Sequence, residues 1–263
     1  MSDYLDRISA NRLTGLNLDT LRELHQQHVR TVPFENLSIH LGEPIVLDED
    51  ALVDKIVRRR RGGFCYELNG AFAALLTALG FQVSLLSAAV IGADGRVGPP
   101  FDHLALRVEL DQPWLADVGF GRHSRFPLAM GEQMLGVDQP DPGGVFRLEP
   151  TPDGDLDVLL NGRVRYRVEL RPRSLADFGP TCWYQQTSPL SHFTRSLACT
   201  LPIEDGQITL SGQRLVRTEG DERVERELTE ADTLTVYQEI FGIPLDRLPE
   251  VEKITSREAG GDD

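Results

Sequence analysis

Residues 58–80 read RRRRGGFCYELNGAFAALLTALG, with four arginines, two glycines and a cysteine directly before an apolar run. Gly62 and Gly63 accept backbone conformations that other residues resist, so the chain can turn sharply there. Beyond the turn, apolar residues recur at helical spacing, at Phe72, Leu75, Leu76 and Leu79. Gly80 is typical of a helix end. The stretch predicts a tight turn followed by a helix that ends at Gly80.

Cys65 falls in the first turn of this predicted helix. A thiolate there would face unpaired backbone N–H groups and the positive end of the helix dipole, with Arg61 nearby, and these conditions lower a cysteine pKa. The other cysteines, Cys182 and Cys199, form no Cys-x-x-Cys pair, so neither a disulfide framework nor a structural zinc site is indicated. We therefore predict Cys65 as a nucleophile and expect no metal.

A nucleophilic cysteine needs a base and a group that orients the base. The next histidine is His103, which opens the alternating stretch HLALRVEL, and Asp117 ends the apolar run PWLAD. An acid in that place is costly unless it is paired, and His103 is its natural partner if the two strands are adjacent. Spacing alone leaves other bases open, namely His25, His28, His40, His123 and His192.

Composition restricts the class of protein. The 263 residues are 40% hydrophobic and 26% charged, and the net charge is −14. This charge disfavours binding to a phosphate backbone, so we expect no nucleic-acid partner. No apolar run approaches the roughly 20 residues that cross a bilayer, and the N-terminus lacks a signal-peptide pattern. We expect a cytoplasmic protein that does not bind membranes.

The pattern changes along the chain. Residues 1–80 are mostly helical in pattern, including NLDTLRELHQQHVRT with cap-type Asn17 and LDEDALVDKIVRR with acids early and bases late. Short alternating strands follow to about residue 170, which predicts an antiparallel sheet or small barrel. GQITLSGQRLVRT predicts a hairpin, and TEADTLTVYQEIFG predicts a helix capped by Thr229 and stopped by Gly242. The tail TSREAGGDD is typical of a frayed end.

These stretches resemble the arylamine N-acetyltransferase family. The resemblance begins in VPFENLSIHLG (32–42), continues in RRGGFCYELNGAFAALLTALGF, HLALRVEL and PWLADVGFG, and returns in RSLADFGPTCWYQQTSPLSHFTRSLACT (173–200) and ITLSGQRLVR. It implies an α+β fold with a cysteine-protease-like core. The implied parts are a helical bundle (1–80), a β-barrel (81–180), an interdomain segment (181–199) and an α/β lid (200–263).

The resemblance also implies a site. Cys65, His103 and Asp117 match a Cys-His-Asp triad, which excludes the other histidines. Phe34, Phe120 and Phe193 match positions that line the acceptor pocket. Two glycine-containing segments match walls near the acyl and pantetheine end, with Gly98, Pro99 and Pro100 in one and Gly119 and Gly121 in the other.

The implied reaction is ping-pong transfer of acetyl from acetyl-CoA, through an acetyl-cysteine, to an arylamine or hydrazine. An arylamine is uncharged at neutral pH and enters an apolar pocket without a large desolvation cost. Two alternatives are an amide synthase of the same family with a larger acyl donor, and a non-catalytic binding protein with the same fold. We predict in addition that Arg61 forms a buried pair with Glu35, whereas residues 58–60 are mostly solvated.

Overall fold

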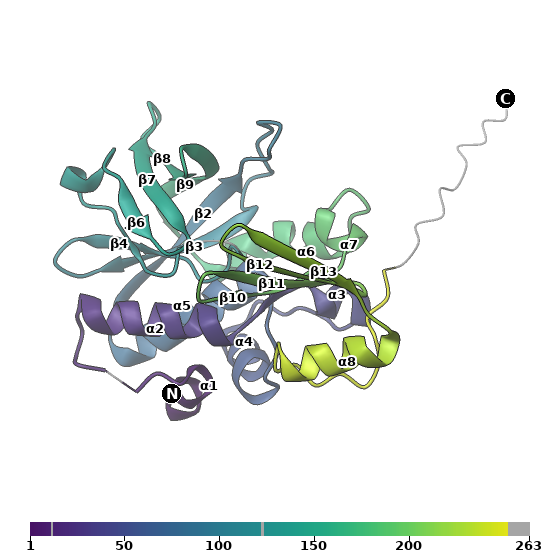
Figure 1. Ribbon diagram of the computed structural model, residues 1–263. Coiled ribbons are helices and arrows are strands. Elements are labelled where there is room, and N and C mark those ends of the chain that lie inside the picture. Colours follow the sequence, from purple (N-terminus) through teal and green to yellow (C-terminus); the bar gives the residue numbers. More distant parts are fainter. Residues whose placement is uncertain (12, 122–123, 252–263) are drawn as a thin grey trace, which may run out of the picture.

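The computed structural model describes residues 1–11, 13–121 and 124–251. The fold is α+β, as predicted, with N-terminal helices, an antiparallel barrel and a second sheet that carries one helix (Figure 1). The candidate base His123 and the tail predicted to fray lie outside the described residues.

The helices before the barrel confirm the predicted helical region. Asn17 accepts a hydrogen bond from the Thr20 N–H at 3.0 Å and so caps the second helix. The helix that begins at Cys65 stops at Gly80, as predicted, and Gly80 has a φ of 100°, the left-handed conformation that glycine favours. The bounds are α1 (Ser2–Ile8), α2 (Leu18–Thr31), α3 (Leu37–Leu41), α4 (Glu49–Val53), the π-helical turn η1 (Asp54–Arg58) and α5 (Cys65–Leu79).

The glycine pair before α5 is required by close approach rather than by backbone φ. Neither glycine has a positive φ, and it is Arg60 that takes the left-handed conformation, with φ of 51°. A Cβ on Gly62 would lie 2.0 Å from the Pro33 carbonyl oxygen, and the Gly63 carbonyl accepts the Glu35 N–H at 2.9 Å. The turn therefore seats the start of α5 against residues 33–35.

The barrel is an eight-stranded antiparallel sheet in the order β5-β4-β3-β2-β9-β8-β7-β6. The two edge strands of this sheet, β5 and β6, are joined by the side chain of Gln139. Its amide oxygen accepts the Ala129 N–H at 2.8 Å, and its amide nitrogen donates to the Ala129 carbonyl at 2.9 Å. Sequence patterns predicted all but the two short edge strands, β5 and β6. The strands are β2 (Gln82–Val90), β3 (His103–Glu109), β4 (Pro113–Ala116), β5 (Leu128–Ala129), β6 (Gln139–Asp141), β7 (Gly144–Pro150), β8 (Leu156–Leu160) and β9 (Arg163–Arg173).

Helix α5 packs on this barrel. Its buried residues Leu68, Phe72 and Leu76 share one core with Leu104 and Leu106 of β3. The first residue of α5 and the first residue of β3 line the same cavity. This helix-on-barrel core is the cysteine-protease-like core that was expected.

The second sheet combines distant parts of the chain. Strand β1 (Phe34–Glu35), from the N-terminal third, pairs with β10 (Cys199–Ile203), so that Phe34 lies opposite Thr200. The predicted hairpin and the predicted helix after it are confirmed. The sequence patterns did not predict β1, β10 or the strand at the far edge of the sheet, residues 222–227. The remaining elements are β11 (Gly206–Ser211), β12 (Arg214–Glu219), β13 (Glu222–Glu227) and α8 (Glu230–Glu239).

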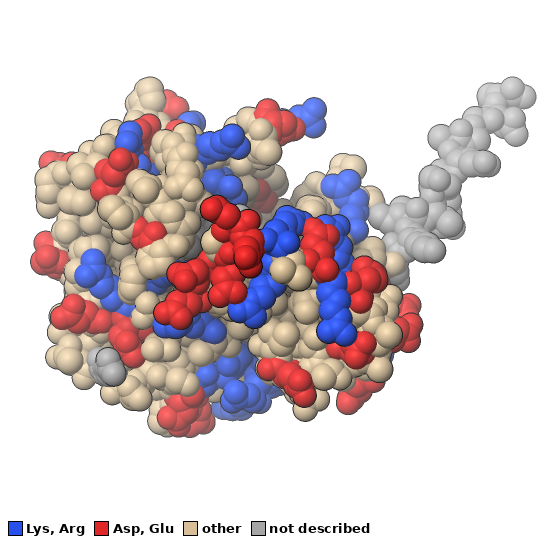
Figure 2. All heavy atoms as spheres, in the orientation of Figure 1, with Lys and Arg blue, Asp and Glu red and all other residues tan. Residues whose placement is uncertain are grey.

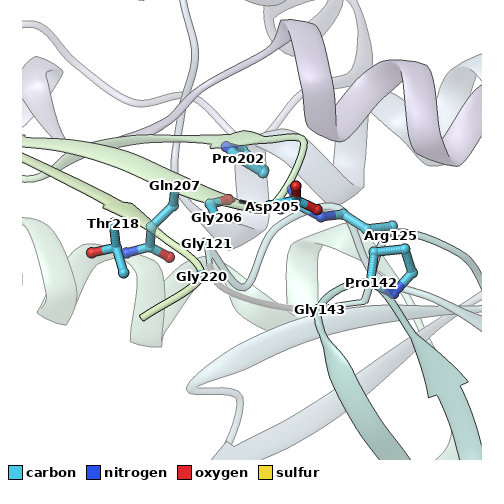
Figure 3. Close-up of a pocket in the computed structure, with 10 residues that line it drawn as sticks. All are labelled: Gly121, Arg125, Pro142, Gly143, Pro202, Asp205, Gly206, Gln207, Thr218 and Gly220. Atoms are coloured by element: carbon cyan, nitrogen blue, oxygen red, sulfur yellow. Dashed lines mark hydrogen bonds between the residues drawn. The ribbon is translucent and has the colours of Figure 1, made fainter. Parts of the chain in front are cut away.

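Arg125 joins this sheet to the barrel. Its Nη2 donates to the carbonyls of Ile203 and Gly206 at 2.9 and 2.8 Å, and its backbone N–H donates to the Asp141 carboxylate. In Figure 3 the Arg125 side chain extends toward the Gly206 turn, beside a small cavity of about 110 Å³. The β10–β11 turn is thus attached to the segment that follows β4.

Between barrel and second sheet run the 3₁₀ turn η3 (Leu175–Phe178), α6 (Gly179–Thr187) and α7 (His192–Arg195). Helix α6 spans residue 180, where the barrel was predicted to end, and the domain limits stay a prediction. On the face in Figure 2, acidic and basic side chains are interspersed over β12 and β13, where Arg214 and Arg223 both pair with Glu225. No helix within the described residues has both the length and the apolar character to cross a bilayer.

Candidate active site

Cys65 is the first residue of α5, as predicted, and is 4% exposed. The helix start is organised by Glu67, whose carboxylate accepts the Phe64 N–H at 3.2 Å and the Lys55 ammonium at 2.6 Å. The Cys65 thiol donates to the Asp102 carbonyl at 3.8 Å. The nucleophile candidate is thereby held beside the residue that precedes β3.

His103 and Asp117 form the pair that the sequence suggested. His103 opens β3, Asp117 directly follows β4, and the two strands are antiparallel neighbours. Nε2 of His103 lies 2.8 Å from Oδ2 of Asp117, and both residues are nearly fully buried. The imidazole also packs edge-on against Phe120, with ring centroids 5.0 Å apart. The carboxylate therefore fixes the orientation of the ring.

The other described histidines have different partners. His25 contacts the backbone of Arg125 and Asp117, and His28 contacts the Tyr4 hydroxyl at 3.0 Å. His40 contacts the Phe193 carbonyl, and His192 contacts Ser196. Among the described histidines, only His103 has its ring against a carboxylate at the cavity that Cys65 lines.

A cavity of about 370 Å³ brings Cys65 and His103 together with the three predicted phenylalanines, Phe34, Phe120 and Phe193. Phe34 comes from β1 and Phe193 from α7, and their ring centroids are 6.2 Å apart. The aromatic wall therefore requires elements from the N-terminal third, the barrel and the segment after it.

Comparison with known proteins identifies the family and supports the fold. A family model described as N-acetyltransferase matches residues 17–250. Arylamine N-acetyltransferase 1 of Homo sapiens is 34% identical over 275 residues, which cover 93% of this chain and 94% of the human protein. The arylamine N-acetyltransferase of Escherichia coli (strain K12) is 34% identical over 256 residues, covering 94% of this chain and 89% of that protein.

This chain belongs to the arylamine N-acetyltransferase family. The solved structure of Mycobacterium marinum arylamine N-acetyltransferase in complex with CoA superposes with a TM-score of 0.82 at 31% identity and covers 92% of both chains. The M. tuberculosis structure gives 0.83 at 32% identity, again with 92% of both chains covered. Members of this family are acyltransferases, so the predicted class of enzyme is confirmed.

The surroundings of the Cys65 thiol differ from those expected from the sequence, which predicted a lowered pKa. Burial raises the pKa of the Cys65 thiol, the Asp102 and Asp117 carboxylates act in the same direction, and the Leu104 N–H opposes them. Arg61, expected nearby as a compensating charge, instead pairs with Glu35 and Glu43. The pKa of Cys65 is therefore raised, and the expected lowering of it by the helix end and Arg61 is wrong.

All three cysteines are buried free thiols. Burial, with Glu67 second, raises the pKa of Cys182 to about 12, and burial also raises the pKa of Cys199. Of the three, Cys65 is the one that lines the cavity with a histidine. The choice of nucleophile therefore follows from its position rather than from an acidic thiol.

Asp117 is held by residues that sequence reasoning missed. Its Oδ1 accepts from Asn69 Nδ2 at 2.8 Å and from the Gly119 N–H at 3.0 Å, and its Oδ2 accepts from the Tyr166 hydroxyl at 3.0 Å. Asn69 lies four residues after Cys65, so helical spacing already placed both on one face of α5. Tyr166 lies on β9 and carried no comparable signal.

The residues of the two predicted glycine-containing walls lie in different places. Pro99 and Gly119 line the cavity that contains Cys65. A Cβ on Gly119 would lie 2.8 Å from the Cys65 Cα, so this position requires glycine by close approach. Gly121 instead lines the small cavity beside Arg125, and Gly98 packs against the Asp102 carboxylate. Pro100 accepts a hydrogen bond from Thr181 and holds α6 to this loop.

Asp102 begins a hydrogen-bond chain along the same cavity, also missed from sequence. Its Oδ1 accepts from Gln185 Nε2 at 2.6 Å, and the side-chain Oε1 of Gln185 accepts from the Ser191 hydroxyl. Ser191 in turn accepts the Phe193 N–H at 3.1 Å. This chain connects the residue before His103 to the backbone of an aromatic wall residue.

Proposed function

We propose that this chain acetylates arylamines and hydrazines by a ping-pong reaction through an acetyl thioester on Cys65. Support comes from the position of Cys65 and His103 in one aromatic-lined cavity of about 370 Å³. It comes also from the family, which includes a relative whose structure contains CoA. The acyl donor in this proposal is acetyl-CoA, and no step requires a metal.

In the first half-reaction, Cys65 transfers its proton to His103 and attacks the thioester carbonyl carbon of acetyl-CoA. Asp117 engages Nε2 of His103, so the proton arrives at Nδ1. The imidazolium that forms is stabilised by the Asp117 carboxylate. The bond between the acetyl carbon and the CoA sulfur breaks, and His103 returns the proton to the departing thiolate.

In the second half-reaction the amine nitrogen attacks the acetyl-Cys65 carbonyl carbon, and His103 accepts the proton that the nitrogen loses. The carbon–sulfur bond to Cys65 breaks, and the restored thiol takes that proton. Phe34, Phe120 and Phe193 bind the aryl ring, while Pro99 and Gly119 lie along the acyl and pantetheine side. An uncharged ring enters this cavity at little desolvation cost.

The decisive experiment is a short pulse of acetyl-CoA without acceptor, followed by mass spectrometry of the peptides. We expect one acetyl group on the peptide that contains Cys65, and loss of that group when an arylamine is added. His103→Gln should abolish labelling, and Asp117→Asn should reduce it sharply. Acetyl transfer by Cys65→Ala, or a label on Cys182 or Cys199, would refute the proposal.

A further inference from the structure

His25 joins helix α2 to both ends of the segment between residues 117 and 125. Its Nε2 lies 3.2 Å from the backbone nitrogen of Asp117, and its Nδ1 lies 3.0 Å from the carbonyl oxygen of Arg125. The ring is fully buried and stands edge-on to Phe72 of α5, with centroids 6.1 Å apart. One side chain therefore connects two points of the backbone that are eight residues apart in sequence.

The segment that His25 holds carries much of the active site. It begins with Asp117 and includes Gly119 and Phe120, which line the cavity. Its far end is already fixed, since the Arg125 N–H donates to Asp141 and the Arg125 side chain to the β10–β11 turn. At its near end, the backbone N–H of Asp117 is held by the imidazole of His25.

The two contacts require one particular form of the ring. The Asp117 N–H can only donate, so Nε2 must be an acceptor, and the Arg125 carbonyl can only accept, so Nδ1 must carry the hydrogen. Only a neutral imidazole satisfies both contacts. Burial lowers the pKa of His25 to about 4, against smaller opposing effects of Arg125 and Asp117, which keeps the ring neutral at physiological pH.

We propose that His25 is a positioning residue for acyl transfer, which sets the backbone at Asp117 and through it the carboxylate that orients His103. The inference rests on the proposed function of that carboxylate. His25 touches neither the cavity nor the reacting atoms, and it acts through Asp117.

Helix α2 supplies a matched control one turn further on. His28 is equally buried and also packs against Phe72, but its ring contacts the Tyr4 hydroxyl and makes no hydrogen bond to the described residues of the 117–125 segment. Replacement of either histidine by phenylalanine keeps the ring and removes the polar contacts. Both changes are expected to lower the melting temperature, and only the change at His25 should alter the chemistry of Cys65.

The experiment measures the second-order rate of Cys65 alkylation by iodoacetamide and the single-turnover rate of its acetylation by acetyl-CoA. Asp117 orients the base, and general-base catalysis contributes roughly 10²–10⁴-fold, so His25→Phe should slow both rates by at least about tenfold. His28→Phe should leave them within about twofold of wild type. His25→Gln, whose carbonyl accepts and whose amide donates, should recover most of the rate, whereas the shorter His25→Asn should not.

Each outcome decides the question. Wild-type rates in His25→Phe, or equal losses in both phenylalanine variants, would overturn the inference. Should His25→Phe fail to fold, equal rates in His25→Gln and His25→Asn would overturn it instead. If acetyl-CoA does not label the wild-type protein, the proposed function fails, while the alkylation rates still test the role of His25.

Discussion

Replacement of Arg61 by methionine should destabilise this protein far more than the same change at Arg59. The Arg61 side chain is 5% exposed, and its Nη2 lies 3.0 Å from Oε1 of Glu35, which is 0% exposed. Burial acts to lower the pKa of Arg61, but Glu35 and Glu43 together raise it, so the guanidinium is held as a cation. The Glu35 carboxylate also accepts the Leu37 N–H at 2.6 Å, which connects this pair to the start of α3.

The expected magnitude follows from what each substitution leaves behind. Arg61→Met leaves the buried Glu35 charge without its cation, and removal of one partner from a buried pair costs about 3–5 kcal/mol. Arg59 is 48% exposed and pairs with Glu43 at 3.1 Å, and an exposed pair contributes about 0–1 kcal/mol. At about 2–4 °C per kcal/mol for a chain of this size, Arg61→Met should lower the melting temperature by roughly 10 °C.

Urea unfolding followed by circular dichroism measures both free energies. Arg59→Met should remain within about 1 kcal/mol of wild type. The double substitution Arg61→Met with Glu35→Gln should be more stable than Arg61→Met alone, because no unpaired charge is then buried. Equal losses in the two single variants, or a double variant less stable than Arg61→Met, would refute the reasoning.

Three further predictions follow from other contacts. Gly62→Ala should destabilise the fold by several kcal/mol in the same urea assay, because its Cβ would lie 2.0 Å from the Pro33 carbonyl oxygen; wild-type stability would show that the turn can move. Asn69→Leu should slow Cys65 alkylation by at least about tenfold, because Asn69 donates to Asp117 and accepts the Val118 N–H; an unchanged rate would contradict this. Burial lowers the pKa of His25 from 6.5 to about 4, so as the pH falls the histidine is protonated in the unfolded state before it is protonated in the folded state. The contribution of neutral His25 to the stability of the fold is therefore complete above pH 6.5 and is lost toward pH 4. At about 1.4 kcal/mol per pKa unit the loss is about 3 kcal/mol, measurable by urea unfolding at pH 7, 5.5 and 4, and a loss of the same size in His25→Gln would assign it to other groups.

The sequence alone determined the elements whose signals are local. The helix that begins at Cys65 and ends at Gly80 follows from apolar spacing and a terminal glycine, and the long barrel strands follow from alternation. His103 and Asp117 could be paired because antiparallel neighbours bring the start of one strand beside the end of the other. The Arg61–Glu35 pair was likewise predicted and is confirmed.

Only the tertiary structure decided the rest, because it depends on residues far apart in the chain. Neither the pairing of Phe34 with Thr200 nor the contact of the Gln139 side chain with Ala129, which joins the two barrel edges, has a periodic signal in the sequence. The contacts of Asn69, Tyr166 and His25 with Asp117 come from three separate elements. The direction of the Cys65 pKa shift is set by burial and by carboxylates that the fold places nearby. Helix position favours a thiolate, but desolvation depends on everything packed around the sulfur, and no local pattern records that.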